Sequence, residues 1–255
     1  MKSYVGGEIR LKNVNSNVGI VITVIKSLNI KRRSYMDLIK HIEESLEWGE
    51  KEVSKLTQDV MNIHGITSNK IRCFLNNICS IGGTYLEIGV FKGATFCSAI
   101  YQNNIHAVGV DNFASPNLMP MGVSQKLAAY IKHGIDVPPQ EHFLNNVKRF
   151  GNTEHIDVYK GDYTTFDYTQ LPKLDIVFYD GDTRFHDQYV TLKKIIPQFS
   201  ERTILIMDDW NWNSGAIDQI IEEEGLIVTH RREVFTNGED INSFWNGLGV
   251  FLIEK

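Results

Sequence analysis

Tyr85-Leu86-Glu87-Ile88-Gly89-Val90-Phe91-Lys92-Gly93 is the stretch that decides the fold. It reads as a buried strand that carries an acidic residue near its end, followed by a turn with two glycines and then a helix. Glycines in such a turn let the backbone approach a ligand closely, and a helix N-terminus offers unpaired N–H groups. A second acidic residue, Asp111, closes the apolar run Ala107–Val110. Strand, glycine turn, helix, strand and acid is the order of a nucleoside-binding βαβ unit.

The chain after this stretch alternates strands and helices. Apolar, β-branched runs predict seven strands at residues 85–88, 107–110, 156–160, 174–179, 203–207, 226–235 and 248–255. Helical patterns follow at residues 94–102, 186–198 and 214–224. This alternation predicts an α/β fold with a doubly wound, mostly parallel, seven-stranded Rossmann-like sheet and helices on both of its faces.

The first 80 residues differ from this alternation and are expected to form an N-terminal arm and helical extension, before a domain at 81–255. Apolar residues recur at spacings of three and four from Ser34 to Met61, which predicts helix. Ser68 is a candidate N-cap for another helix, Asn69–Asn77. The β-branched segment Val18–Ile25 has three interpretations: an added strand, an arm onto a partner subunit, or the lead-in to a helix. An apolar segment here is compatible with a homodimer.

Residues 112–155 form an insertion in the predicted domain. They contain no strand pattern, are interrupted by prolines and glycines, and include helical patterns at Ser124–His133 and Gln140–Phe150. A long excursion from the ligand-side end of a strand predicts a lid or a substrate wall. The alternative is a helix that covers the edge of the sheet.

Composition limits the classes of partner. The chain has 255 residues and a net charge of −5, which gives no electrostatic signature of nucleic-acid binding. Its three cysteines lack metal-ligand spacing and favour a reducing compartment. The N-terminus lacks the pattern of a signal peptide, and Val18–Ile25 is too short to cross a membrane. We therefore expect a cytoplasmic protein with a small-molecule or glycan partner, and neither a nucleic-acid nor a membrane partner.

Acidic residues close every predicted core strand. In doubly wound sheets, ligands bind beyond the carboxyl ends of the strands. Asp and Asn often occupy such ends as turn formers, so a single acid there means little, whereas a series indicates a site. The acids of this series are Glu87, Asp111, Asp162, Asp180, Asp208 and Asp209.

Three of these acids are expected to lie together. Asp180 follows one strand, and Asp208 and Asp209 follow a strand that should be its neighbour. Three carboxylates at one place repel one another unless a cation lies among them or one stays protonated. A hard divalent cation with oxygen ligands, Mg²⁺, Mn²⁺ or Ca²⁺, is the expected occupant. The only imidazole near this point in the sequence is that of His186.

These motifs resemble a known family. The spacing E-x-G-x-x-x-G departs from the dinucleotide fingerprint and is similar to the first motif of class I S-adenosylmethionine methyltransferases. Together with Tyr179-Asp180-Gly181-Asp182 and Asp208-Asp209-Trp210, it resembles the macrocin-type O-methyltransferases that modify sugars. The wider group of metal-dependent O-methyltransferases, including the catechol and caffeoyl-CoA enzymes, is also similar. The resemblance covers about residues 80–255.

The resemblance implies a division of roles. Asp111 would bind the ribose hydroxyls of S-adenosylmethionine, and Asp162 would read the adenine amino group. Glu87 and Gly89 would line the methionine end, in a turn that Gly93 completes. Phe91 would pack beside the cofactor, although a solvent-facing turn residue is the alternative.

The same resemblance implies the chemistry. Magnesium held by Asp180, Asp208 and Asp209 would bind adjacent hydroxyls of a sugar or other vicinal diol, and the methyl group would pass to one of them. Coordination lowers the pKa of a hydroxyl, and Asp180 or His186 would take the proton. Many relatives have D-G-D-H or D-G-x-H where this chain runs from Asp180 to His186, so the imidazole is displaced. The insertion and Trp210-Asn211-Trp212 are expected as walls, with Tyr179 nearby, and ordinary core packing is the alternative for these rings.

Other functions remain open from the sequence. An NAD-linked oxidoreductase would use the same fold, but the glycine spacing is wrong for it. A metal-dependent hydrolase would use the three aspartates and leave Asp111 without a role. A catalytically silent binding protein would not need the intact series of acids.

Overall fold

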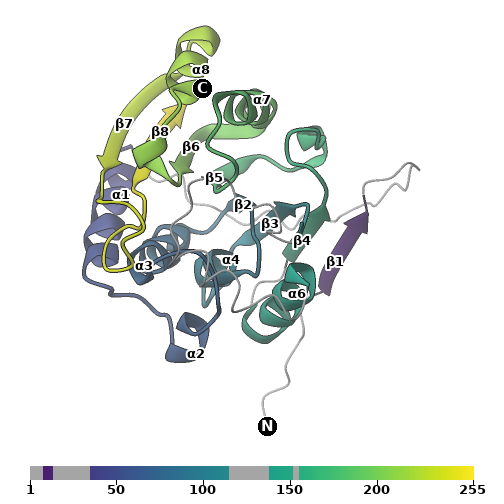
Figure 1. The fold of residues 1–255 in the computed structure, drawn as a ribbon. Coiled ribbons are helices and arrows are strands. Elements are labelled where there is room, and N and C mark those ends of the chain that lie inside the picture. The colour runs from purple at the N-terminus through teal and green to yellow at the C-terminus, as the bar shows by residue number, and fades with distance from the viewer. Residues whose placement is uncertain (1–7, 14–34, 115–137, 152–154) are drawn as a thin grey trace.

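Eight strands form one sheet in the part of the chain that the computed structural model describes, residues 8–13, 35–114, 138–151 and 155–255 (Figure 1). They are β1 (Glu8–Asn13), β2 (Thr84–Ile88), β3 (His106–Asp111), β4 (His155–Lys160), β5 (Leu174–Tyr179), β6 (Phe199–Met207), β7 (Ile227–Val234) and β8 (Leu248–Glu254). Their order is β1-β4-β3-β2-β5-β6-β8-β7. The pairs from β1 to β6 are parallel, and β8 is antiparallel to both of its neighbours.

This order determines where a ligand can bind. The chain proceeds from β2 outward through β3 and β4, and then returns to β5 on the other side of β2. The carboxyl ends of β2, β3, β5 and β6 therefore meet at one edge of the sheet, and the strand order reverses at β2. A crevice at such a reversal is the usual ligand site of doubly wound folds.

The predicted sheet is confirmed, with all seven strands present and the last one antiparallel. The start of β6 was predicted at Thr203, but the strand begins at Phe199, because the polar residues after Phe199 concealed a paired segment. β1 was not predicted and adds an eighth strand beside β4. Val18–Ile25 lies outside the described residues.

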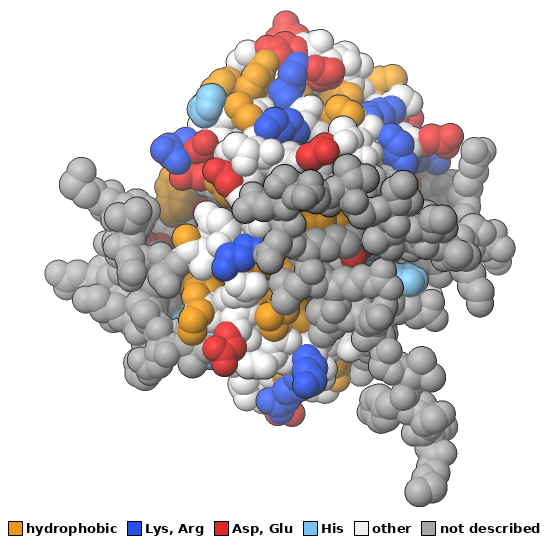
Figure 2. Space-filling view, turned by 90° about the vertical axis from the view of Figure 1, so that its right-hand side faces the viewer, with side chains coloured by type: hydrophobic (Ala, Val, Ile, Leu, Met, Phe, Trp, Pro, Cys, Tyr) orange, Lys and Arg blue, Asp and Glu red, His pale blue; other side chains and the backbone are white. Residues whose placement is uncertain are grey.

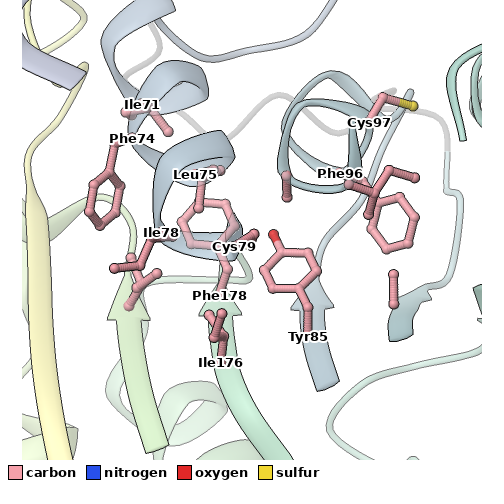
Figure 3. Close-up of a cluster of buried hydrophobic side chains, with 14 of the residues drawn as sticks. Ile71, Phe74, Leu75, Ile78, Cys79, Tyr85, Phe96, Cys97, Ile176 and Phe178 are labelled. Atoms are coloured by element: carbon pink, nitrogen blue, oxygen red, sulfur yellow. The ribbon is translucent and has the colours of Figure 1, made fainter. Parts of the chain in front are cut away.

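Helices cover both faces of the sheet (Figure 1). One face carries α1 (Tyr35–Glu50), α3 (Asn69–Ile78), α4 (Ala94–Ile100) and α6 (Pro139–Phe150), which share one buried apolar cluster with the strands. The other face carries α7 (Phe185–Ile195) and α8 (Ala216–Glu224), with a second cluster. Figure 3 shows the first cluster, where Leu75 of α3 lies beside Phe178 of β5, and Phe96 of α4 lies on the side of Tyr85 of β2. The N-terminal helices thus share a core with the sheet.

The helix predicted from Ser34 to Met61 is in fact two helices, α1 and the short α2 (Gln58–Met61). At the end of α1, Glu52 adopts a left-handed conformation with φ 53°, and the Val53 N–H donates to the Trp48 carbonyl at 2.8 Å. A left-handed residue with a hydrogen bond back across the last turn is a helix stop, which apolar spacing does not reveal. The predicted cap of α3 is confirmed, since the Ser68 hydroxyl accepts from the Ile71 N–H at 3.3 Å.

The described end of the insertion packs on the face of the sheet that also carries α4. The predicted helix Gln140–Phe150 is present as α6, and the Phe143 ring lies 5.3 Å from that of Phe96 and 5.5 Å from that of Phe113. The other predicted helix, Ser124–His133, lies outside the described residues, so the lid stays a prediction. None of the described helices is long and apolar enough to cross a membrane.

Candidate functional site

A cleft of about 1030 Å³ opens at the carboxyl edge of the sheet. Its floor comes from the residues that follow β2, β3, β5 and β6, the strands that meet at the reversal of order. Those that the sequence predicted as site residues are Gly89, Phe91, Asp111, Asp180, Asp208 and Asp209. Of the six acids that the sequence predicted, four therefore line this one cavity, namely Asp111, Asp180, Asp208 and Asp209.

The turn after β2 requires glycine at position 89. Gly89 has φ +84°, and a Cβ atom there would lie 2.0 Å from the carbonyl oxygen of Asp180. The parallel ladder continues at this point, where the Asp180 N–H donates to the Ile88 carbonyl at 2.9 Å. The ends of β2 and β5 are therefore in backbone contact. Gly93, with φ +87°, occupies the N-cap of α4 and is not among the residues that line the cleft.

Asp111 fixes this turn and also faces the cleft. Its carboxylate accepts hydrogen bonds from the Phe91 N–H at 2.7 Å and the Phe113 N–H at 2.5 Å. Burial raises the pKa of Asp111, and the backbone donors oppose that shift. Each carboxylate oxygen has a second lone pair, so hydroxyl donors of a ligand can still be accepted. Phe91 has φ 45° and lines the cleft beside it.

Glu87 lies beneath the cleft and does not line it. Its side chain is fully buried and accepts hydrogen bonds from the Thr95 hydroxyl at 2.6 Å and from the Tyr85 hydroxyl. Burial raises the pKa of Glu87 to about 8, against the effect of both hydroxyl donors. At pH 7 the group is therefore mainly protonated. Thr95, which does line the cleft, lies between Glu87 and any ligand.

The three predicted aspartates form an acidic cluster, defined as Asp180, Asp208 and Asp209. The Asp208 N–H donates to the Tyr179 carbonyl at 2.9 Å, which sets the two strand ends side by side. Asp180 and Asp208 share a side-chain hydrogen bond, and burial followed by the charges of Asp208 and Asp209 raises the pKa of Asp180 well above its usual range. Burial likewise raises the pKa values of Asp208 and Asp209.

The chemistry of this cluster suits a hard cation. Asp208 is 6% exposed, and its Oδ1 atom is buried without a hydrogen-bond partner. A buried carboxylate oxygen of this kind is costly unless something positive meets it. Among the described residues, however, no three acidic, histidine or cysteine side chains are grouped as metal ligands. The carboxylates of the cluster are of the type that binds a divalent cation. In this structure the side chains of Asp180 and Asp208 share a hydrogen bond with each other.

The aromatic walls differ from the prediction. Trp210 is 2% exposed and Tyr179 is 1% exposed, and both belong to the core beneath α7 and α8. Trp210 packs against Phe251, with ring centroids 5.4 Å apart. Core packing, the alternative interpretation, therefore holds for these two rings. Trp212 is half exposed and does line the cleft.

Besides Glu87 and Gly93, two more predicted site residues do not line the cleft, Asp162 and His186. Asp162 is exposed after β4, where its Oδ1 accepts from the backbone N–H of Thr164 at 2.8 Å and from its hydroxyl at 2.7 Å. Its role at the adenine stays a prediction. His186 is exposed in the first turn of α7 and is not among the lining residues. Of the two predicted bases, only Asp180 faces the cleft.

The cleft also has contributors that the sequence did not predict. Gly65, Ile66 and Thr67, from the connection between α2 and α3, form part of the wall. A Cβ atom at Gly65 would lie 2.3 Å from that of Ala94, so this connection packs directly on the start of α4. Glu239, Trp245 and Asn246 come from the loop between β7 and β8. No periodicity or strand-end signal marks these residues, because tertiary packing places them.

Residues 86–210 match the model of a family described as a methyltransferase domain. No curated protein matches the chain. Similar solved structures include the O-methyltransferase NovP, at 13% identity over 84% of this chain and 98% of that one, with a TM-score of 0.48. A methyltransferase from Podospora anserina with bound SAH is 13% identical over 92% and 98%, with a TM-score of 0.46. An rRNA methylase from Streptococcus thermophilus is 10% identical over 72% and 93%, with a TM-score of 0.41.

Proposed function

We propose that this chain, whose residues 86–210 match a methyltransferase domain, transfers a methyl group from S-adenosylmethionine to a hydroxyl of a small acceptor with the help of a divalent cation. One observation carries the proposal. The cleft at the reversal of strand order joins a glycine turn and an acid after β3 to three aspartates after β5 and β6. A nucleoside site and a cation site are thus adjacent in one cavity.

The nucleoside half of the cleft consists of the turn after β2 and Asp111. Gly89 has no side chain, so a ligand can approach the backbone at this position of the turn. Asp111, with free lone pairs beside the Phe91 backbone, would accept the two hydroxyls of a ribose. Thr95 and the neutral Glu87 behind it would face the methionine end without placing a second negative charge there.

The cation half consists of Asp180, Asp208 and Asp209, and Mg²⁺ is the proposed occupant. A bound divalent cation would lower the pKa of a coordinated acceptor hydroxyl and fix its position. The chain's own part is to supply the three carboxylates, of which that of Asp208 is buried and those of Asp180 and Asp209 are half-buried. Asp180 is the proposed proton acceptor, because it is the one of the two predicted bases that lines the cleft.

The proposed acceptor is a sugar or other vicinal diol, in line with the resemblance to macrocin-type enzymes. The described lining of the cleft carries six carboxylates against Lys92 and Arg184, and Arg184 is paired with Asp182 at 3.0 Å and Asp187 at 2.7 Å. Such a surplus of negative charge repels a polyanion. On the face drawn in Figure 2, basic and acidic side chains of the described residues are mixed, without the basic stripe that nucleic-acid binding needs. Trp212 offers a ring for stacking on a sugar face.

Ligand-induced thermal shifts test the proposal. S-adenosylhomocysteine at millimolar concentration should raise the melting temperature, because a ligand that binds only the folded state stabilises it by mass action. NAD should not. A chain stabilised by NAD and unaffected by S-adenosylhomocysteine would be an oxidoreductase, and the proposal would be wrong. Transfer of labelled methyl to a panel of diols, with and without a chelator, then separates the cation from the methyl transfer.

A further inference from the structure

Asn246 belongs to the β7–β8 loop, residues 235–247, and its side chain contacts the acidic cluster. Its side chain is 2% exposed and lines the cleft. The Nδ2 atom donates to Asp209 Oδ1 at 2.8 Å, and Oδ1 accepts from the Glu239 N–H at 2.6 Å. A backbone N–H can only donate, so the amide oxygen must face Glu239 and the amide nitrogen must face Asp209. Both sides of the amide are therefore fixed.

The backbone around Asn246 holds this contact in register. β6 and β8 pair as far as Met207 and Gly249, and hydrogen bonds continue beyond the strands toward the cleft. The Trp210 N–H donates to the Gly247 carbonyl at 3.2 Å, and the Asn211 N–H donates to the Asn246 carbonyl at 2.8 Å. Asp209 lies within this turn at φ 54°, in a left-handed conformation that is uncommon for residues other than glycine. The turn thus presents the Asp209 carboxylate to the Asn246 amide.

A second asparagine anchors the same loop without touching a carboxylate. The Asn211 side chain donates to the Thr236 carbonyl at 3.0 Å and accepts from the Thr236 N–H at 3.0 Å. Asn211 and Asn246 therefore both hold the β7–β8 loop, but only the Asn246 amide is hydrogen-bonded to the acidic cluster. A substitution of Asn211 should therefore weaken the anchoring of the loop without removing a hydrogen bond to the Asp209 carboxylate. Asn211 is the matched control for Asn246.

We propose that Asn246 is a positioning residue that joins the Asp209 carboxylate and the acceptor-side wall of the cleft into one unit. This inference rests on the proposed function, because it takes Asp209 as a ligand of the divalent cation. The Nδ2 donor holds Oδ1 of Asp209 and leaves Oδ2 for the cation. The amide oxygen holds Glu239, whose side chain lines the cleft with that of Trp245. A cation that fixes Asp209 therefore also steadies the loop that faces the acceptor.

Calorimetric titration of Mg²⁺ into the protein saturated with S-adenosylhomocysteine tests this role. N246A should bind Mg²⁺ about 10- to 100-fold more weakly than the wild type, the usual effect of removing a group that orients a metal ligand. Its affinity for S-adenosylhomocysteine should stay within about twofold, since Asn246 does not touch the nucleoside half of the cleft. N211A should bind Mg²⁺ within about threefold of the wild type. Equal Mg²⁺ affinity of N246A and wild type, or an equal loss in N211A and N246A, would overturn the assignment.

Hydrogen exchange of the wild-type protein gives a readout that needs no variant. Mg²⁺ added to the S-adenosylhomocysteine complex should slow exchange in residues 236–246 about fivefold or more, and leave β2 unchanged. Unchanged exchange in this segment would overturn the coupling even if N246A failed to fold. A wild-type protein that binds S-adenosylhomocysteine but no Mg²⁺ would overturn the cation and the role of Asn246 together, and methyl transfer would stand.

Discussion

Replacing Glu87 by Gln should stabilise the protein at alkaline pH and change little at acid pH. Glu87 is fully buried, and burial raises its pKa to about 8 from an ordinary value of 4.5. Between these two values the unfolded chain has released a proton that the folded chain keeps. The free energy of unfolding of the wild type must therefore fall as the pH rises through this window, because ionisation then favours the unfolded state. A glutamine at this position does not ionise, so the free energy of unfolding of E87Q does not fall for this reason.

The size of the effect follows from the two pKa values. Between pH 5 and pH 8 the wild type should lose about 3.5 kcal/mol of stability through this one group, which E87Q does not lose. For a protein of this length, 1 kcal/mol shifts the melting temperature by about 2–4 °C, so the gap between the two proteins should widen by roughly 7–14 °C. The Thr95 and Tyr85 hydroxyls can hydrogen-bond an amide as well as a carboxylic acid, so the two proteins should differ little at pH 5.

Urea denaturation of both proteins at half-unit steps from pH 5 to pH 8.5 measures the difference directly. Asp111, Asp180 and Asp208 also titrate, but they are common to both proteins and cancel in the comparison. E222Q, at an exposed position on α8, controls for the chemical change itself. A difference between E87Q and wild type that stays below 1 kcal/mol across this range would show that Glu87 is ionised in the folded protein, and the account of its burial would be refuted.

Four further outcomes are expected. G89A should unfold at lower urea concentration and lose S-adenosylhomocysteine binding in calorimetry, because its Cβ would lie 2.0 Å from the Asp180 carbonyl oxygen; wild-type affinity would mean that the turn moves freely. D111N should bind S-adenosylhomocysteine about 10- to 100-fold more weakly, the loss of hydrogen bonds to a charged acceptor, and unchanged affinity would place the ribose elsewhere. D208N should abolish transfer of labelled methyl and keep cofactor affinity within about twofold; full activity would discard the cation site. H186A should keep transfer within about twofold, since the side chain is exposed on α7, whereas a large loss would restore the imidazole as the base.

The sheet could be predicted because its signals are local. Each core strand is a short apolar run bounded by turn residues, and the acids near the ends of β2, β3, β5 and β6 lie within two positions of the last strand residue. Parallel pairing then brings those ends to the same edge of the sheet, independently of the conformation of the connecting loops. Asp162, which follows β4, is exposed and accepts hydrogen bonds from Thr164, so its role at the adenine stays a prediction. A strand end shows where a side chain begins but not whether it turns toward the cleft.

The extent of burial could not be predicted from the same signals. Trp210 and Trp212 are two positions apart in one motif, yet one packs in the core and the other lines the cleft. Glu87 was expected at the surface of the cleft, but the alternation of β2 turns it toward α4, beneath Thr95. In both cases the local sequence predicts the strand or the turn. Packing against other parts of the fold then determines which side chain is buried and which lines the cleft.

The wall of the cleft shows how the two ends of the chain complete a site that the central strands begin. Gly65 approaches Ala94 so closely that no side chain fits between them, which sets the α2–α3 connection against the start of α4. Asn246 reaches Asp209 only because β8 returns antiparallel beside β6. Residues 86–210 therefore supply the nucleoside turn and the acidic cluster, whereas residues outside that match line the rest of the cleft. On the proposed function the acceptor contacts that wall, so substitutions in the β7–β8 loop should change acceptor choice before they change cofactor affinity.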